Sequence, residues 1–181
     1  MNTALVLVDI QNDYFPGGAM ALVDMKEAAA QAARALAHAR QKGWVIVHIQ
    51  HQSVRPDASF FMPGTPGAEH HASVMPASDE VVVVKHFPNA FRESSLGAVL
   101  SVNDVSQLVI CGAMSHMCID ATTRAAFDAG FLCTVLSDAC ATRDLAYNGE
   151  IVPAAQVHAA FMAALATPFA KVTSTDALLA E

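Results

Sequence analysis

Residues 108–130 read LVICGAMSHMCIDATTRAAFDAG, and this stretch predicts a strand, a turn and a helix in succession. Residues 108–111 are all apolar, as expected for a strand that is buried on both faces. Helix-forming residues follow from Ile119, and Gly130 is a typical residue for the end of a helix. A strand that turns into a helix is the repeating unit of folds with a parallel sheet.

The same alternation runs through the whole sequence. Further apolar runs predict strands at residues 4–8, 45–49, 81–84, 132–136 and 170–173. Helical patterns occupy residues 25–41, 94–102, 119–129 and 151–166. We therefore predict an α/β fold in three layers, with helices on both faces of a parallel sheet and residues 1–181 as a single domain.

Composition excludes several classes of function. The chain has 10 Lys+Arg against 17 Asp+Glu, a formal net charge of -7, so we expect neither nucleic acid nor an anionic membrane as a partner. No apolar run reaches the roughly 20 residues of a membrane span, and the first residues lack a secretory signal pattern, which predicts a cytoplasmic protein. The four cysteines show no CxxC spacing, so we expect reduced thiols. No glycine-rich phosphate loop is present, and we expect no cofactor.

Three reactive side chains follow predicted strands. Asp9 comes directly after the first apolar run, Lys85 after the third, and Cys118 lies six residues beyond Gly112 where a helix begins. Ligands of parallel sheets bind at the carboxyl ends of the strands, so these side chains should converge. Taken singly, each has an ordinary explanation as a turn residue, a solvated lysine or a small core residue. Their coincidence favours a site.

A carboxylate, an ammonium and a thiol make chemical sense together. The thiolate is the nucleophile, and we expect the helix start and Lys85 to lower the pKa of Cys118. Asp9 could accept the thiol proton and return it to a leaving amine. Backbone amides of the turn at residues 113–118 could stabilise an oxyanion.

Three sequence blocks carry a family resemblance. LVLVDIQNDYF (5–15), VVVVKHFPNAF (81–91) and LVICGAMSHMCIDATTRAAFDAGF (108–131) resemble the motif blocks of the isochorismatase-like cysteine hydrolases, in the same order. DACATRD (138–144) and VHAAFMAALA (157–166) extend the resemblance toward the C-terminus. It implies a six-stranded parallel sheet, with Asp9 as acid/base, Lys85 as electrostatic partner and Cys118 as a nucleophile that forms a thioester. It also implies a cis peptide between Ala113 and Met114, and an oxyanion hole formed by the amides of Met114 and Cys118.

The resemblance also bears on the substrate and on metals. Amidase members of the family use the cysteine, whereas isochorismatases proper commonly lack it, so Cys118 favours cleavage of a C–N bond. Nicotinamidases hold a metal with an Asp-x-His pair that aligns here with Gln50 and Gln52, so we expect no metal site. The remaining histidines in this region show no firm ligand spacing; they are His48, His51, His70, His71 and His86.

Several residues beside the motif blocks are candidates for the substrate pocket, and the long irregular stretch at residues 52–79 is a candidate pocket wall. The candidates are Gln11, Tyr14, Phe15, Gln50, Phe60, Phe91 and His116.

The sequence thus predicts a cofactor-free hydrolase of small amides, ureides or lactams. Two alternatives stay open: a vinyl-ether hydrolase in which Cys118 is a bystander, and a catalytically silent binding or assembly protein on the same fold. The resemblance implies a small-molecule partner and a homodimer or homotetramer.

Overall fold

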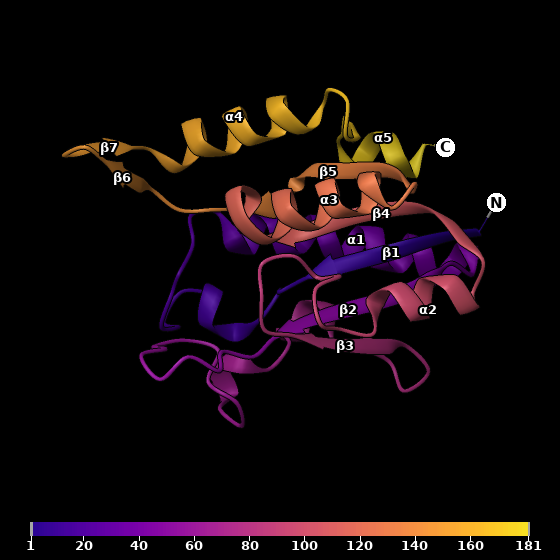
Figure 1. The fold of residues 1–181 in the computed structure, drawn as a ribbon, viewed down its shortest axis with the longest axis horizontal. Coiled ribbons are helices and arrows are strands. Elements are labelled where there is room, and N and C mark those ends of the chain that lie inside the picture. The colour runs from indigo at the N-terminus through magenta and orange to yellow at the C-terminus, as the bar shows by residue number, and fades with distance from the viewer. Residues whose placement is uncertain (1, 181) are drawn as a thin grey trace.

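The computed structural model describes residues 2–180 and contains six parallel strands in one sheet (Figure 1). The spatial order is β3-β2-β1-β4-β5-β8. The strands are β1 (Asn2–Val8), β2 (Val45–His51), β3 (Val81–Lys85), β4 (Val105–Ala113), β5 (Leu132–Ala141) and β8 (Lys171–Thr173). Each predicted apolar run overlaps one of these strands, and the prediction of a three-layer α/β fold is confirmed.

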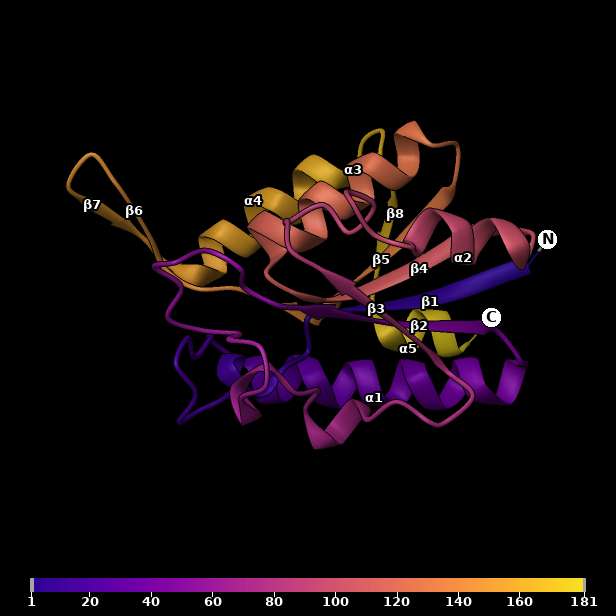
Figure 2. The same cartoon turned by 60° about the horizontal axis from the view of Figure 1, so that its bottom comes forward.

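Helices cover both faces of the sheet (Figure 2). The helices α1 (Met25–Lys42) and α5 (Thr175–Leu179) lie on one face, and α2 (Leu96–Val102), α3 (Asp120–Asp128) and α4 (Ala154–Leu165) lie on the other. Helix α1 turns a row of buried alanines toward the sheet, and these small side chains let the helix approach closely. It ends at Gly43, whose φ of 66° suits glycine.

The central strand β1 separates two hydrophobic cores. Leu5 and Leu7 pack on the side of α1, whereas Val6 and Val8 pack on the side of α2 and α3. This alternation follows from the two-residue period of a strand. Because both faces are covered, the strand shows no alternation of polar and apolar residues in its sequence.

The chain order creates a natural site between β1 and β4. From β1 the chain builds outward through β2 to β3, and it then returns to add β4, β5 and β8 on the other side. Ligands of open parallel sheets bind at such a switch point, beyond the carboxyl ends of the strands. Asp9 and the turn that holds Cys118 follow these two strands.

One predicted helix begins later than expected. Residues 151–152 belong to an antiparallel hairpin of β6 (Leu145–Tyr147) and β7 (Glu150–Val152), and α4 starts only after Pro153. The hairpin projects from the end of the molecule at which the strands of the large sheet terminate (Figures 1 and 2). The turn residues Asn148 and Gly149 both have positive φ, as a type I′ hairpin turn requires.

The segment at residues 52–79 contains two short 3-10 turns, Pro66–Ala68 and Ala72–Val74, and no strand. It packs beside the turn after β1, since Gln11 forms a β-bridge with His70. Among residues 2–180, no helix combines the length and the apolarity needed to cross a membrane.

Candidate active site

The three reactive side chains predicted from the strand ends meet in the structure. Lys85 Nζ lies 2.7 Å from Asp9 Oδ2 and 3.3 Å from Cys118 Sγ. Asp9 and Lys85 are fully buried, and Cys118 is 4% exposed. Asp9 follows β1, Lys85 ends β3, and Cys118 lies in the turn Ser115–Ile119 between β4 and α3.

A fourth side chain completes this centre. His51, the last residue of β2, accepts a hydrogen bond at Nδ1 from Lys85 Nζ at 2.8 Å. Strand β2 lies between β1 and β3, so its end brings His51 between the two charged residues. The sequence suggested His51 only as a possible metal ligand, although His51 also lies at the end of a strand, like Asp9 and Lys85.

Unusual backbone shapes the centre. Asp9 has a φ of 54°, in the left-handed region, and its amide still donates to Ile49 O at 3.1 Å, which keeps the turn attached to β2. The peptide bond between Ala113 and Met114 is cis. The turn that follows is held from behind, because Ser115 Oγ lies 2.9 Å from His158 Nδ1 on α4.

The electrostatics correct one expectation. Burial and then the Asp9 carboxylate raise the pKa of the Cys118 thiol, and they outweigh the opposing effect of Lys85. The predicted lowering is therefore wrong: the thiol is protonated at rest. Burial pulls the pKa of Lys85 down, but the charges of Asp9 and Cys118 outweigh it and raise that pKa overall. The resting centre thus holds the Lys85 ammonium beside a neutral Cys118 thiol.

A cavity of about 320 Å³ adjoins the centre and shares His51 with it. Phe60, Pro88 and Met117 give it an apolar part, and His86 adds a polar group. A cavity of this size admits a small molecule rather than a peptide or a polymer.

A comparison with models of protein families matches residues 3–177 to the isochorismatase domain. The chain belongs to the isochorismatase family. It is 50% identical over 179 residues to the isochorismatase family protein YddQ of Bacillus subtilis, covering 99% of each. It is 30% identical over 154 residues to the maleamate amidohydrolase of Pseudomonas putida, covering 77% of this chain and 72% of that one. A crystal structure of an isochorismatase hydrolase from Oleispira antarctica has a TM-score of 0.96 and 51% identity, covering 99% of this chain and 97% of that one.

The isochorismatase-family resemblance and the fold it implied are thereby confirmed, and the chain is a hydrolase of this family. The structure brings Tyr14 and Phe60 to the site among the predicted pocket residues. Tyr14 is buried; after burial itself, the charges of Cys118 and Asp9 are the main causes that raise its pKa. Its ring centroid lies 6.1 Å from that of Phe60.

Two predicted pocket glutamines of this isochorismatase-family chain are held by the backbone. Gln11 is fully buried, and its amide bonds to His51 O at 2.9 Å and Ala68 O at 2.8 Å. Gln50 also donates to Ala68 O, at 2.9 Å. These contacts give both residues a supporting role, and direct contact with a ligand stays a prediction for them.

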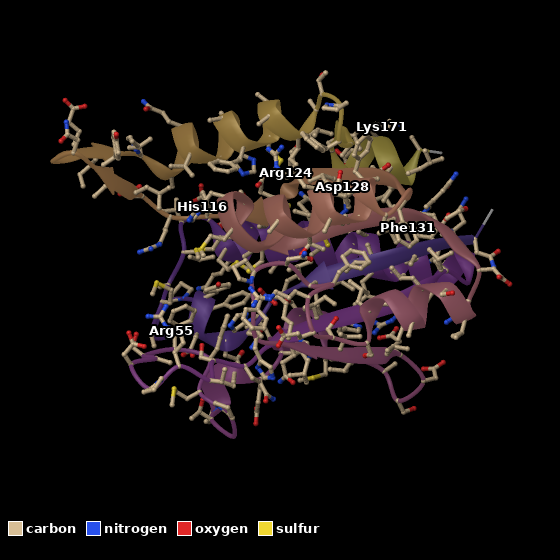
Figure 3. All side chains as sticks on the ribbon, viewed as in Figure 1. Arg55, His116, Arg124, Asp128, Phe131 and Lys171 are labelled. Carbon is tan, nitrogen blue, oxygen red and sulfur yellow. The ribbon has the colours of Figure 1, made fainter. Side chains whose placement is uncertain are left out.

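The predicted pocket residues Phe15 and Phe91 pack against different parts of the molecule. Phe15 stacks on His71 with ring centroids 3.5 Å apart. Phe91 packs against Phe131, which directly precedes β5 and so lies at the amino end of that strand, away from the carboxyl ends that carry the site. Figure 3 shows the two ends of the molecule: His116 and Arg55 lie near one end, and Phe131 lies near the other.

His116 lies beside the site and close to Arg143, a residue that was not among the predicted site residues. Its Nδ1 lies 2.6 Å from Thr142 Oγ1. The neighbouring Arg143 is exposed, and its charge lowers the pKa of both Tyr14 and His116, although burial dominates each shift. Arg143 thus places a positive charge close enough to act on two side chains of the site.

The histidines considered for a metal have separate partners. His48 contacts Glu80 Oε2 at 2.9 Å, His71 contacts Ser73, and His86 lies 2.7 Å from Gln52 O. His70 packs with its ring centroid 5.6 Å from that of His48.

Within residues 2–180, three possible metal ligands converge at one place only, where atoms of Asp9, His51 and Cys118 lie within 4.8 Å of one another. Lys85 Nζ contacts all three of these residues, so its ammonium supplies the positive charge that they surround. The donor set therefore does not fit a metal ion while Lys85 stays in this position.

Proposed function

We propose that this protein is a cysteine-dependent amidohydrolase that cleaves the C–N bond of a small amide, ureide or lactam through a Cys118 thioester. The observation that carries the proposal is the contact of the Lys85 ammonium with both Asp9 and Cys118 in a fully buried centre. The similarity to a maleamate amidohydrolase supports amide chemistry. The small adjoining cavity supports a small substrate.

The first step couples attack to proton transfer. Because the resting thiol is neutral, Cys118 needs a base, and Asp9 is the carboxylate within hydrogen-bonding reach. As Sγ forms a bond to the carbonyl carbon, Asp9 takes the thiol proton and the carbonyl oxygen becomes an oxyanion. The proposal assigns the amides of Met114 and Cys118 to that oxyanion.

The second step breaks the C–N bond. The oxyanion collapses, protonated Asp9 delivers its proton to the leaving nitrogen, and the acyl group stays on Cys118 as a thioester. Water then attacks the thioester carbon while Asp9 accepts a proton from it, and the returning proton restores the thiol. The sum is amide plus water to acid plus amine, with Asp9 acting alternately as base and acid.

Lys85 keeps its charge throughout. Its ammonium contacts the carboxylate before proton transfer and the developing thiolate afterwards, so it stabilises whichever partner is negative.

The state of the cysteines bears on the compartment. All four are free and buried, namely Cys111, Cys118, Cys133 and Cys140. Because free thiols suit a reducing compartment, we propose that the enzyme acts in the cytoplasm.

The test combines a panel of small amides, ureides and lactams with intact-protein mass spectrometry. Wild-type protein should release amine or ammonia and show a transient acyl adduct that peptide mapping assigns to Cys118. Cys118→Ala should lose turnover by about 10⁴-fold or more. Cys133→Ala is the matched control. Cys133 lies at the start of β5, whereas the site lies at the carboxyl ends of the strands, so this variant should keep full turnover.

Two results would replace this proposal. Turnover of a vinyl ether that survives in Cys118→Ala identifies an isochorismatase-type reaction in which the cysteine is a bystander. Binding of panel compounds without turnover or adduct in the wild type identifies a silent binding protein on the same fold.

A further inference from the structure

The Lys85 ammonium has three hydrogen-bond acceptors around it, and only two belong to the proposed catalytic set. The third is His51 Nδ1, at 2.8 Å. An ammonium has three N–H donors and no acceptor, so Asp9, Cys118 and His51 together match its full donor capacity. Removing any one acceptor leaves a buried charged donor unpaired.

The contact fixes the state of the imidazole. Because Lys85 Nζ can only donate, Nδ1 of His51 must be unprotonated, and a neutral ring then carries its proton on Nε2. Burial and then the Lys85 charge lower the pKa of His51 to about 4. The ring is therefore neutral and a competent acceptor across the physiological pH range.

The backbone of His51 is held in register from the neighbouring turn. Gln11 Nε2 donates to His51 O at 2.9 Å, and His51 N donates to Gln11 Oε1 at 2.8 Å. Gln11 is fully buried, so water does not compete for this pair of bonds. The position of Nδ1 is thus set before a substrate arrives.

We propose that His51 is a positioning residue of this centre, whose neutral imidazole holds the Lys85 ammonium against Asp9 and Cys118. Its effect on turnover rests on the proposed amidohydrolase function, whereas its effect on the reactivity of Cys118 does not. A merely structural histidine would change stability without acting through Lys85. The coupling between His51 and Lys85 is therefore the quantity to measure.

The experiment measures the rate at which chloroacetamide alkylates Cys118 at fixed pH, with mass spectrometry assigning the site. His51→Leu removes the acceptor, and His51→Asn keeps an acceptor because its Oδ1 is as many bonds from the backbone as Nδ1. We expect His51→Leu to slow alkylation by about 10- to 100-fold, the range for a lost hydrogen bond to a charged group. His51→Asn should stay within about threefold of wild type.

A double-mutant cycle with Lys85→Met isolates the mechanism. If His51 acts through Lys85, His51→Leu has no further effect once Lys85 is gone. Equal effects of His51→Leu in both backgrounds, or equal slowing by His51→Leu and His51→Asn, would overturn the proposal. Failure of every compound in the amide panel would refute the amidohydrolase function and leave this cycle unchanged, so the two failures are distinguishable.

A second measurement reads the protonation state of His51 in the wild-type centre directly. Long-range ¹⁵N–¹H correlation spectra of the wild type report which ring nitrogen of each histidine is protonated, and His51→Asn identifies the His51 signals by their absence. We expect an unprotonated Nδ1 and a protonated Nε2 from pH 6 to 8. A proton on Nδ1 in that range would overturn the proposal, because such a ring cannot accept from Lys85.

Discussion

The Asp13 carboxylate accepts a hydrogen bond at 2.6 Å from the amide of Phe61, 48 residues further along the chain. Its other oxygen accepts from the amide of Ala19 at 3.2 Å. Phe61 is fully buried, and its ring centroid lies 4.6 Å from that of Tyr14. One carboxylate therefore joins the turn after β1 to the segment at residues 52–79. It also holds Phe61 of that segment against Tyr14 at the site.

Asp13→Ala should release that segment. The change leaves the buried Phe61 amide unpaired, so we expect a loss of about 1–3 kcal/mol in the free energy of unfolding and faster proteolysis within residues 52–79. Urea denaturation and limited proteolysis measure both. Asp57→Ala is the control from the same segment, because that carboxylate pairs with Arg55 at the surface and should matter little. Equal losses in the two variants would contradict this role of Asp13.

The labelling of Cys118 should depend steeply on pH. Because the pKa of the thiol is raised, alkylation at pH 7 should be slow and should increase about tenfold per pH unit as the thiolate fraction grows. Asp9→Asn removes a charge that opposes the thiolate, so it should speed labelling at fixed pH while abolishing amide turnover. Lys85→Met should slow labelling. A rate independent of pH between 6 and 8 would mean that the thiolate is already formed at rest.

Gly112→Ala should damage both fold and site. Gly112 has a φ of 124°, and an added Cβ would collide with the carbonyl of Val8, the residue before Asp9. We expect a loss of about 2 kcal/mol or more in the free energy of unfolding. Gly97→Ala in α2 is the control, because the nearest atom to its Cβ would be 4.0 Å away. It should be neutral or stabilising by thermal unfolding, and an equal loss in both variants would argue against the steric explanation.

Glu80 should make the protein sensitive to acid. Its hydrogen bond with Arg40 is the main cause that lowers its pKa from 4.5 to about 2. A folded-state pKa below the unfolded value stabilises the protein above about pH 4.5, and this contribution disappears as pH falls toward 2. Unfolding measured from pH 5 to 2.5 should therefore show a shallower pH dependence in Glu80→Gln. An unchanged slope in Glu80→Gln would contradict this role of Glu80.

The sequence predicted the strands well, because the two covered faces of the sheet demand apolar runs that are easy to recognise. It did not predict that β5 continues through Ser137 and Asp138 to Ala141. Asp138 accepts hydrogen bonds from the amide and hydroxyl of Thr175, and this partner lies 37 residues away. A polar residue inside a strand depends on such distant contacts, which local pattern does not contain.

The site was predictable in part. The strand-end rule found Asp9, Lys85 and Cys118, whose contacts the structure describes. The predicted direction of the shift in the Cys118 pKa was wrong. A helix start and a lysine, which lower a thiol pKa, can be recognised in the sequence, whereas the depth of burial, which raises it, cannot. The hairpin was missed although Asn148–Gly149 is a strong turn signal, because its flanking residues lack the alternation of a strand that packs on a core.

The β6–β7 hairpin offers an attachment point that is separate from the rest of the molecule. Tyr147 is 80% exposed, and the Asn148–Gly149 turn stands clear of the large sheet in Figures 1 and 2. A fluorophore or an immobilisation tag inserted in this turn would leave the buried strands untouched. The base of the hairpin lies next to Arg143, whose charge acts on Tyr14 and His116. A dye placed there could therefore report the arrival of a ligand as a change in its emission.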